Sequence, residues 1–251
     1  MEMFSLRGRC AMITGAGRGI GRAIAGAMAR AGAHVILSGR TSAPLNDAAE
    51  ILNQSGYTAS ALVMDVASPA AIEAGFVRLS GLTDRLDILV NNAGIEEICP
   101  SVDVDEARWD RILGTNLKGA FFCARQAARI MGQGGSILNI CSLTSEVGIP
   151  TAVPYGAAKT GLAGVTRALA AEWAPRGIRV NGIGPGYFRT AMTEGFYADE
   201  DWCQTMLGKI PMRRFGELAE LEGAAVFLCS PAASYITGQI LYIDGGFLAS
   251  I

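Results

Sequence analysis

Residues 9–32, RCAMITGAGRGIGRAIAGAMARAG, decide the fold of this 251-residue chain. They comprise a short apolar run, a glycine-rich turn and an alanine-rich stretch, which predicts a strand, a turn and a helix. The turn has the pattern Gly15-x-x-x-Gly19-x-Gly21, with Ile20 between its last two glycines. Such a turn lets the backbone approach a pyrophosphate closely, and the N-terminus of the following helix favours negative charge. The stretch therefore predicts a dinucleotide-binding unit.

Strand-like and helix-like segments alternate along the rest of the chain. Further strands are expected at HVILSGR (34–40), ASALVMDV (59–66), LDILVNNAG (86–94), SILNI (136–140), IRVNGIGPG (178–186) and QILYID (239–244). Helices are expected over 43–55, 154–174 and 217–229. Another helix is expected to start at Ser68-Pro69, and one more is expected to run from the acidic caps Asp103 and Asp105 to about residue 131. This alternation predicts a single-domain, doubly wound Rossmann fold, with a parallel seven-stranded sheet and helices on both faces. Ligands of such sheets bind beyond the carboxyl ends of the strands.

Composition excludes several classes of partner. The net charge is −2 with no basic run, which argues against nucleic acid and anionic membranes. No apolar stretch is long enough to span a bilayer, and MEMFSLRGRC lacks the apolar core of a secretory signal. The six cysteines form no CxxC pair, which indicates a reducing compartment. With one histidine, His34, we expect no metal site, and we expect a cytoplasmic protein.

Two arginines indicate which dinucleotide binds. An acidic residue about 20 positions beyond the glycine turn accepts a ribose 2′-hydroxyl, whereas an arginine there accommodates a 2′-phosphate. The second strand ends at Ser38-Gly39-Arg40-Thr41 without a carboxylate, and Arg18 lies inside the turn. Two guanidiniums favour a dianionic phosphate. We therefore expect NADP(H) rather than NAD(H).

Residues 141–159, CSLTSEVGIPTAVPYGAAK, carry the candidate chemistry. Tyr155 and Lys159 are four residues apart, which on a helix places them on one face about 6 Å apart along the axis. We expect the lysine ammonium to lower the pKa of Tyr155 well below about 10. Such a tyrosine exchanges a proton with a carbonyl or alcohol. Ser142 follows a predicted strand, which would bring its hydroxyl to the same edge of the sheet.

The whole chain resembles the short-chain dehydrogenase/reductase family of about 250 residues. The resemblance is carried by Thr14-Gly15-x-x-x-Gly19-x-Gly21, Asp65, Asn91-Asn92-Ala93-Gly94, Asn116, Ser142, Tyr155-x-x-x-Lys159, Asn181, Pro185-Gly186 and Asp244-Gly245-Gly246. It implies hydride transfer between a nicotinamide and a carbon that carries an oxygen. It also implies one NAD(P)-binding domain over 1–251, with a cofactor half at about 1–150 and the catalytic helix and substrate loops at about 142–215. Family likeness further implies a homotetramer.

The resemblance implies a role for each matched residue. Tyr155 would be the general acid in reduction and the base in oxidation, while Lys159 would lower its pKa and hold the nicotinamide ribose. Ser142 would bond the substrate oxygen. Asn116 would lie where its helix loosens and hold a water that links Lys159 to solvent. The cofactor would contact Gly15, Arg18, Gly19, Ile20, Gly21, Arg40, Asp65, Val66, Asn92, Ala93, Gly94, Tyr155, Lys159, Pro185, Gly186, Phe188 and Thr190.

Three segments are expected to line the substrate pocket: 94–99, 143–153 and 187 to about 202. They contribute Glu96, Glu97, Glu146, Tyr187, Arg189, Met192, Phe196 and Trp202. The segments PGYFRTAMTEGFYADEDW (185–202) and GAAVFLCSPAASYITGQILYIDGGFLASI (223–251) resemble gluconate 5-dehydrogenase-like members. However, Glu96 and Glu97 would repel a sugar carboxylate unless Arg189 turned inward. A small neutral ketone, polyol or sugar fits the sequence equally well.

Two other functions remain open. A 3-oxoacyl-(acyl carrier protein) reductase would use the same residues, but it needs a basic docking surface for an acidic carrier. The connection MGQGGS (131–136) has no lysine or arginine, although Arg125, Arg129 and Arg176 are near it. A non-catalytic dinucleotide-binding protein would be favoured by loss of Tyr155 or Lys159, and both are present.

Overall fold

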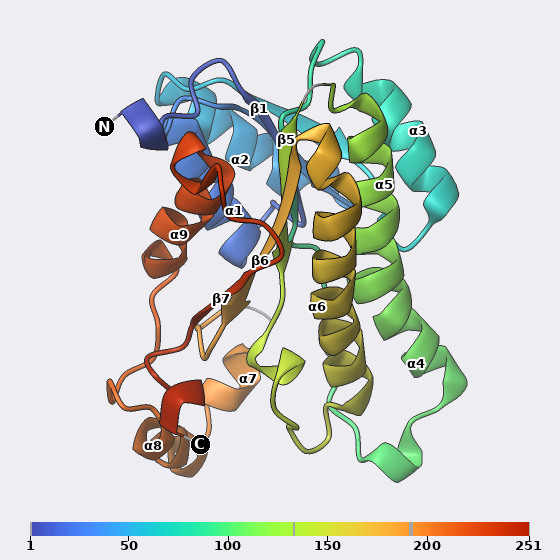
Figure 1. Ribbon diagram of the computed structural model, residues 1–251. Coiled ribbons are helices and arrows are strands. Elements are labelled where there is room, and N and C mark those ends of the chain that lie inside the picture. Colours follow the sequence, from blue (N-terminus) through green and yellow to red (C-terminus); the bar gives the residue numbers. More distant parts are fainter. Residues whose placement is uncertain (1, 133, 191–192, 251) are drawn as a thin grey trace.

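One parallel sheet organises the computed structural model, which describes residues 2–132, 134–190 and 193–250. Its strand order is β3-β2-β1-β4-β5-β6-β7 (Figure 1). The strands are β1 (Cys10–Thr14), β2 (His34–Gly39), β3 (Ala59–Val63), β4 (Ile88–Asn91), β5 (Gly135–Ile140), β6 (Ile178–Pro185) and β7 (Ile240–Ile243). The order reverses between β1 and β4, so the predicted doubly wound, seven-stranded parallel fold is confirmed.

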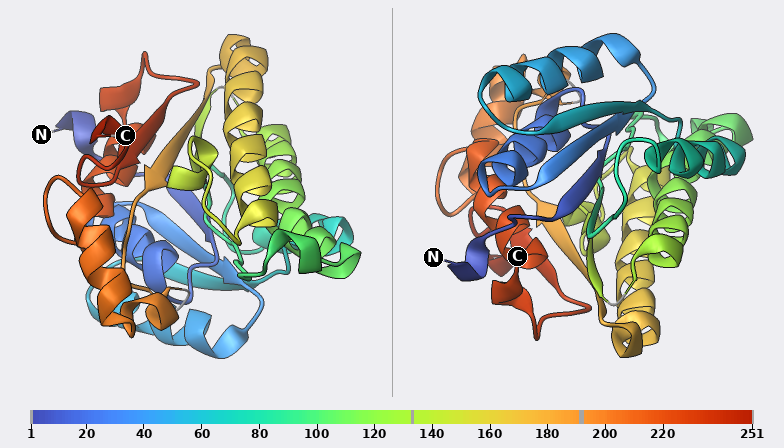
Figure 2. Two further views of the ribbon diagram at one scale, coloured as in Figure 1. Left: turned by 90° about the horizontal axis from the view of Figure 1, so that it is seen from below. Right: turned by 90° about the horizontal axis from the view of Figure 1, so that it is seen from above.

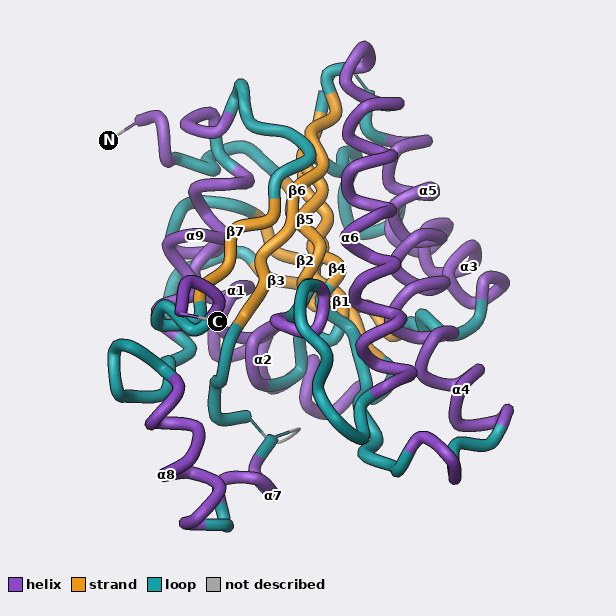
Figure 3. Tube along the Cα trace, turned by 60° about the horizontal axis from the view of Figure 1, so that its bottom comes forward, coloured by secondary structure: helices purple, strands orange, loops and turns teal. Residues whose placement is uncertain are grey.

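Helices form a layer on each face of the sheet (Figures 1 and 2). One layer contains α1 (Gly19–Arg30), α2 (Ser42–Gln54) and α9 (Ala219–Cys229). The other contains α3 (Pro69–Leu79), α5 (Ala120–Ile130) and α6 (Val153–Trp173), with α4 (Glu106–Leu113) leading into α5. The short α7 (Glu194–Tyr197) and α8 (Glu200–Lys209) follow β6 and lie beyond the sheet (Figure 3). Single 3₁₀ turns span Glu2–Phe4, Ser101–Asp103, Leu143–Ser145, Ala174–Arg176, Pro231–Ala233 and Leu248–Ser250.

The strands are apolar on both sides because each face of the sheet packs against a helical layer. In β1, Ala11 and Ile13 join the core that includes α1 and α9. Cys10 and Met12 alternate with them and join the core that includes α3, α5 and α6. None of the described helices is long and apolar enough to cross a membrane. All six cysteines are free, and five of them are buried.

Two of the three predicted helix caps are found. Ser68 accepts a hydrogen bond from the amide of Ala71 at 3.2 Å and starts α3, and Asp105 accepts one from Arg108 at 2.7 Å and starts α4. Asp103 does not cap a helix, since it lies in a 3₁₀ turn. The single helix expected from 103 to 131 is interrupted by a π-helical turn at Gly114–Gly119.

The segment after β6 also differs from the expectation, because the sequence analysis predicted that it lines the pocket and predicted no helix in it. Two short helices, α7 and α8, form there, and Asp199 caps α8 by accepting a hydrogen bond from the amide of Trp202 at 3.0 Å.

Candidate active site

The glycine turn after β1 has the conformation and the packing that require glycine. Gly15 and Gly19 adopt φ values of +66° and +55°, which side chains disfavour. A Cβ on Gly21 would lie 2.4 Å from Nδ2 of Asn92 and 2.5 Å from the carbonyl oxygen of Gly15. Glycine at 21 therefore permits close contact between α1 and the turn. No side chain caps the N-terminus of α1 and no acidic residue occupies its first turn, so an anion could bind there.

Thr14 and Asn92 join the glycine turn to the end of β4. The hydroxyl of Thr14 accepts hydrogen bonds from the amides of Asn92 and Ala93, both at 3.0 Å. In return, Nδ2 of Asn92 donates to the carbonyl oxygens of Thr14 at 2.9 Å and Gly15 at 3.2 Å. The Asn92 side chain, which the sequence analysis listed among the cofactor contacts, thus supports the glycine turn.

A cleft of about 1320 Å³ runs along the carboxyl edge of the sheet. Two of the predicted site residues, Gly21 and Asn116, do not line it. The others line one continuous wall: Gly15, Arg18, Gly19, Ile20, Arg40, Asp65, Val66, Asn92, Ala93, Gly94, Ser142, Tyr155, Lys159, Pro185, Gly186, Phe188 and Thr190. The tertiary structure therefore brings together residues from both ends of the chain. Their chemical roles remain predictions.

Two exposed cations lie at the end of the cleft nearest the glycine turn. Arg18 and Arg40 both line it, and neither guanidinium has an acidic partner among the described residues. Asp65, another predicted cofactor contact, uses Oδ1 to accept a hydrogen bond from the amide of Ala67 at 3.0 Å. This end of the cleft can bind a phosphate dianion without breaking an existing ion pair.

Ser142, Tyr155 and Lys159 lie together at the centre of the cleft. Tyr155 and Lys159 are one turn apart on α6, and the lysine Nζ lies 5.5 Å from the centroid of the tyrosine ring. Nζ donates a 2.6 Å hydrogen bond to the carbonyl oxygen of Ile140, and the lysine side chain is buried. Ser142 follows β5 directly, and its hydroxyl accepts a hydrogen bond from the amide of Thr144 at 3.2 Å.

The expected effect of Lys159 on Tyr155 is not found. The pKa of Tyr155 lies above its ordinary value because of burial first and the negative charge of Glu96 second, against a lowering influence of the Ser142 hydroxyl. Burial lowers the pKa of Lys159, against the raising influence of Glu96 and Cys141. The prediction failed because helical spacing fixes the positions of the two side chains but neither their burial nor the acid across the cleft.

Asn116 lies in the π-helical turn, as expected of a residue placed where its helix loosens. Its Oδ1 accepts a hydrogen bond from the amide of Ile95 at 2.8 Å, and its Nδ2 donates to the carbonyl oxygen of Ile95 at 2.7 Å. Asn116 thereby holds the loop after β4 against the helix. A Cβ on Gly94 would come within 3.1 Å of the Asn116 Oδ1, which favours glycine at that position.

The other end of the cleft is lined mainly by aromatic side chains. The predicted residues Tyr187, Phe196 and Trp202 contribute to it. The rings of Phe196 and Trp202 stack with centroids 5.5 Å apart, and Tyr187 meets Trp202 edge-on at 5.7 Å. The predicted Met192 lies outside the described residues.

Three predicted pocket residues do not line the cleft. Arg189 lies over the ring of Tyr197, 5.0 Å from its centroid, and is 3.9 Å from Glu194. Glu146 accepts a 2.8 Å hydrogen bond from the hydroxyl of Tyr242. The third, Glu97, is bound by two arginines of α4. Sequence segments could not distinguish these residues from their cleft-lining neighbours, because each side chain is turned away from the cleft by a contact that forms only in the folded chain.

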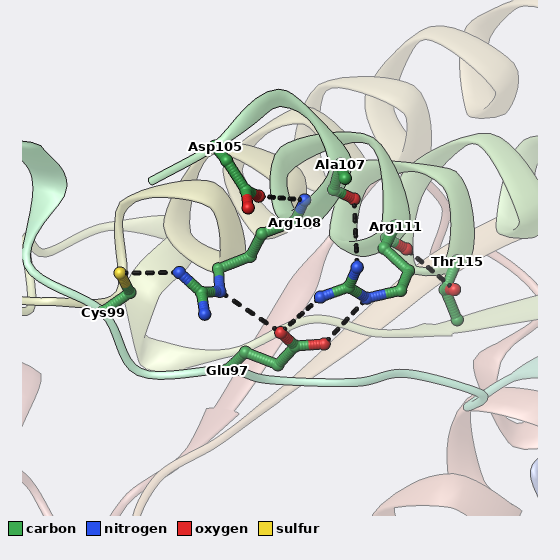
Figure 4. Close-up of polar contacts among 7 residues, drawn as sticks. All are labelled: Glu97, Cys99, Asp105, Ala107, Arg108, Arg111 and Thr115. Atoms are coloured by element: carbon green, nitrogen blue, oxygen red, sulfur yellow. Dashed lines mark hydrogen bonds and ion pairs between the residues drawn. The ribbon is translucent and has the colours of Figure 1, made fainter. Parts of the chain in front are cut away.

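Glu97 is held between Arg108 and Arg111 (Figure 4). Arg111 binds it through two nitrogens, at 2.6 and 3.0 Å, and Nε of Arg108 lies 3.3 Å away. These contacts lower the pKa of Glu97, chiefly through the Arg111 hydrogen bonds. Arg108 also donates a hydrogen bond to Sγ of Cys99 at 2.8 Å. The loop after β4 is therefore fixed to α4.

Several cleft residues were not identified from the sequence, and Lys209 and Phe247 are two of them. Lys209, at the end of α8, lines the cleft and is exposed. Phe247 also lines it and meets Tyr187 edge-on at 5.5 Å. The position of Phe247 could have been predicted from the preceding Asp244-Gly245-Gly246 motif. Asp244 accepts hydrogen bonds from the amides of Gly246 and Leu248 and so shapes the turn that carries Phe247. For Lys209 we find no local signal.

Comparisons with known proteins agree with this geometry. Residues 15–248 match the family described as enoyl-(acyl carrier protein) reductase. Gluconate 5-dehydrogenase of Gluconobacter oxydans (strain 621H) is 40% identical over 253 residues, which cover 100% of this chain and 98% of the relative. Galactitol 2-dehydrogenase (L-tagatose-forming) of Cereibacter sphaeroides is 41% identical over 249 residues, which cover 98% of this chain and 97% of the relative.

A solved structure extends the comparison to three dimensions. The crystal structure of a gluconate 5-dehydrogenase from Burkholderia cenocepacia J2315, in complex with NADP and tartrate, superposes with a TM-score of 0.97 at 37% identity, covering 100% of this chain and 99% of that one. The similarity thus spans the glycine turn, the catalytic helix and the C-terminal strand alike. On these grounds the chain belongs to the short-chain dehydrogenase/reductase family and is an oxidoreductase.

Proposed function

We propose that this enzyme interconverts a secondary alcohol and a ketone in a small polyhydroxylated substrate, a sugar acid or a polyol, with NADP(H) as cofactor. The observation that carries the proposal is the cleft itself, in which Tyr155, Lys159 and Ser142 lie between an arginine-bearing end and an aromatic end. The relatives that act on gluconate and galactitol, and the relative that binds NADP, support the same substrate class and cofactor.

The residues at the arginine-bearing end fit a phosphorylated dinucleotide. Positive φ angles at Gly15 and Gly19 shape the turn, and the uncapped start of α1 offers free amides for a pyrophosphate. Arg18 and Arg40 are exposed and unpaired among the described contacts, so they would hold the 2′-phosphate. When bound, the nicotinamide group supplies or accepts the hydride.

The chain's own residues supply orientation and a proton. Tyr155 donates its phenolic proton to the carbonyl oxygen in reduction and removes the hydroxyl proton in oxidation. Ser142 donates a hydrogen bond to the same substrate oxygen and stabilises the negative charge that develops on it. Lys159 replaces the proton that Tyr155 has given up and holds the ribose hydroxyls. Asn116, which lies in the π-helical turn, would hold the water that connects this route to solvent.

Reduction of a substrate carried by acyl carrier protein is less well supported. Of the three arginines that could attract an acidic carrier, Arg125 has an acidic neighbour, Glu73 at 3.9 Å, whereas Arg129 and Arg176 contact neutral groups and keep their charge. Arg125 lies 4.5 Å from the ring centroid of Phe122, Arg129 donates to Oε1 of Gln126 at 3.3 Å, and Arg176 donates to the carbonyl oxygen of Ala128. Because the connection at 131–136 adds no lysine or arginine to these three, we place this activity second.

Steady-state kinetics with NADP⁺ and NAD⁺ across polyols, sugar acids and simple secondary alcohols test the proposal. We expect turnover with NADP⁺ and a polyhydroxylated substrate, and its loss in Tyr155→Phe with NADPH binding retained. The matched control is Tyr235→Phe, which removes a hydroxyl from a fully exposed tyrosine that does not line the cleft. Wild-type protein that binds NADPH but turns over no compound in the panel would instead be a non-catalytic dinucleotide-binding protein.

We also propose that residues 1–251 form one NAD(P)-binding domain, with its cofactor half at about 1–150 and its catalytic helix and substrate loops at about 142–215.

For assembly we propose a cytoplasmic homotetramer. The 91% exposure of Val102 and the small residues Gly156, Ala157, Gly161 and Gly164 along α6 support close packing between copies. Elution as a 26.2 kDa species at micromolar concentration would contradict the tetramer.

A further inference from the structure

Two adjacent glutamates follow β4, and their surroundings differ. Glu97 has its charge balanced by Arg108 and Arg111 and does not line the cleft. Glu96 lines the cleft, is half-buried, and has no hydrogen-bond or ion-pair partner among the described residues. The arginine contacts to Glu97 fix the loop (Figure 4), so Glu96 stays at the cleft wall.

The carboxylate of Glu96 acts on the reacting groups. Its charge raises the pKa of Tyr155 and of Tyr187, and it interacts favourably with the ammonium of Lys159. Burial raises the pKa of Glu96 itself, and Lys159 opposes that increase. A substrate bound between Tyr155 and Tyr187 must therefore lie within the field of this carboxylate.

Among the described residues that line the cleft, the arginines are Arg18 and Arg40, which belong to the end beside the glycine turn. Arg189 is directed to Tyr197 and Glu194 and does not line the cleft. Lys209 does line it, but its side chain is exposed and belongs to α8, where water screens its charge. A substrate carboxylate held near Glu96 would thus face a half-buried like charge.

We infer that Glu96 is a specificity-determining residue that accepts a hydrogen bond from a substrate hydroxyl and selects an uncharged polyol or ketose over a sugar acid. The inference rests on the proposed function and narrows its substrate class. A carboxylate is an acceptor with no donor, so it pairs well with a hydroxyl group and repels another carboxylate. The aromatic rings opposite would pack against the C–H groups of the carbon chain.

The test uses three compounds that share a six-carbon skeleton and differ in charge. D-glucitol is neutral, D-gluconate is an anion, and 1-amino-1-deoxy-D-glucitol is a cation at about pH 8. The measured quantity is kcat/KM with NADP⁺ for each compound, or the inhibition constant for a compound that is bound but not oxidised. The galactitol series serves as a second skeleton.

We expect the wild-type enzyme to prefer glucitol to gluconate. Glu96→Gln, which preserves shape and removes the charge, should raise the gluconate-to-glucitol ratio at least about tenfold and lower the relative value for the amine. Glu146→Gln is the matched control, because it removes a charge from a loop beside the cleft without changing the lining. The gluconate-to-glucitol ratio of Glu146→Gln should equal that of the wild-type enzyme.

The possible failures are distinguishable. If the wild-type enzyme oxidises no compound in the wider panel of polyols, sugar acids and simple secondary alcohols, the proposed function is wrong. If it oxidises them with a ratio that Glu96→Gln leaves unchanged, only the inference is overturned. A preference for gluconate that disappears in Lys209→Gln would also overturn it, because the carboxylate would then bind at α8.

Discussion

Replacing Arg40 by aspartate should convert the cofactor preference of the enzyme. Arg40 lines the cleft, is exposed, and has no acidic partner among the described residues, so its removal breaks no ion pair. A hydrogen bond from a guanidinium to a phosphate contributes about 1.5–3 kcal/mol, which corresponds to roughly 10–100-fold in binding. The aspartate adds repulsion of the phosphate. We therefore expect the KM for NADPH to rise by about 100-fold.

The same change should alter the KM for NADH by less than about threefold, because that cofactor lacks the phosphate and its ribose hydroxyl can donate to the new carboxylate. Initial rates with both cofactors at low and high salt provide the assay, and the NADPH effect should shrink as salt screens the charges. Arg22→Asp, on an exposed position of α1 that does not line the cleft, is the control. Equal changes for the two cofactors in Arg40→Asp would refute the phosphate contact.

Three further perturbations test other parts of the structure. Gly21→Ala should lower the free energy of unfolding by about 1–3 kcal/mol and abolish NADPH binding, because its Cβ would meet the Gly15 oxygen and the Asn92 amide. The control Gly26→Ala should fold normally, since its Cβ would meet only the flexible end of Arg30, and equal denaturant midpoints for the two variants would contradict the packing argument. Glu97→Gln should lower Tm by about 2–4 °C near neutral pH, because it removes the charge that binds Arg108 and Arg111. Since the folded-state pKa of Glu97 is depressed, this difference should vanish as pH falls through that pKa, and a difference that stays constant with pH would contradict the ion-pair argument. Glu96→Gln should move the acidic limb of the pH profile of kcat for alcohol oxidation to lower pH, because the charge of Glu96 raises the pKa of Tyr155 and of Lys159. Tyr155 also faces Ser142 and Cys141. An acidic limb that does not move would show that the charge of Glu96 does not affect Tyr155.

The sequence alone determined the fold and the order of its parts. The alternation of apolar runs with helical segments predicts a parallel sheet, because parallel strands are joined by crossover connections that are usually helices. Local patterns also placed the glycine turn and the spacing of Tyr155 and Lys159, since φ angles and helical periodicity depend on neighbouring residues. The helix interruption at Asn116 was likewise anticipated from the resemblance.

Tertiary structure alone decided the electrostatics of the site. The sequence presents Glu96 and Glu97 as equivalent, yet Glu97 is neutralised by α4 and Glu96 faces the cleft. The pKa of Tyr155 lies above its ordinary value because of burial and the charge of Glu96, while the ammonium of Lys159 is bound to the carbonyl of Ile140. Lys209 enters the cleft only because α8 folds back over it. Charge interactions depend on distance and burial, which are properties of the folded chain that residue spacing does not record.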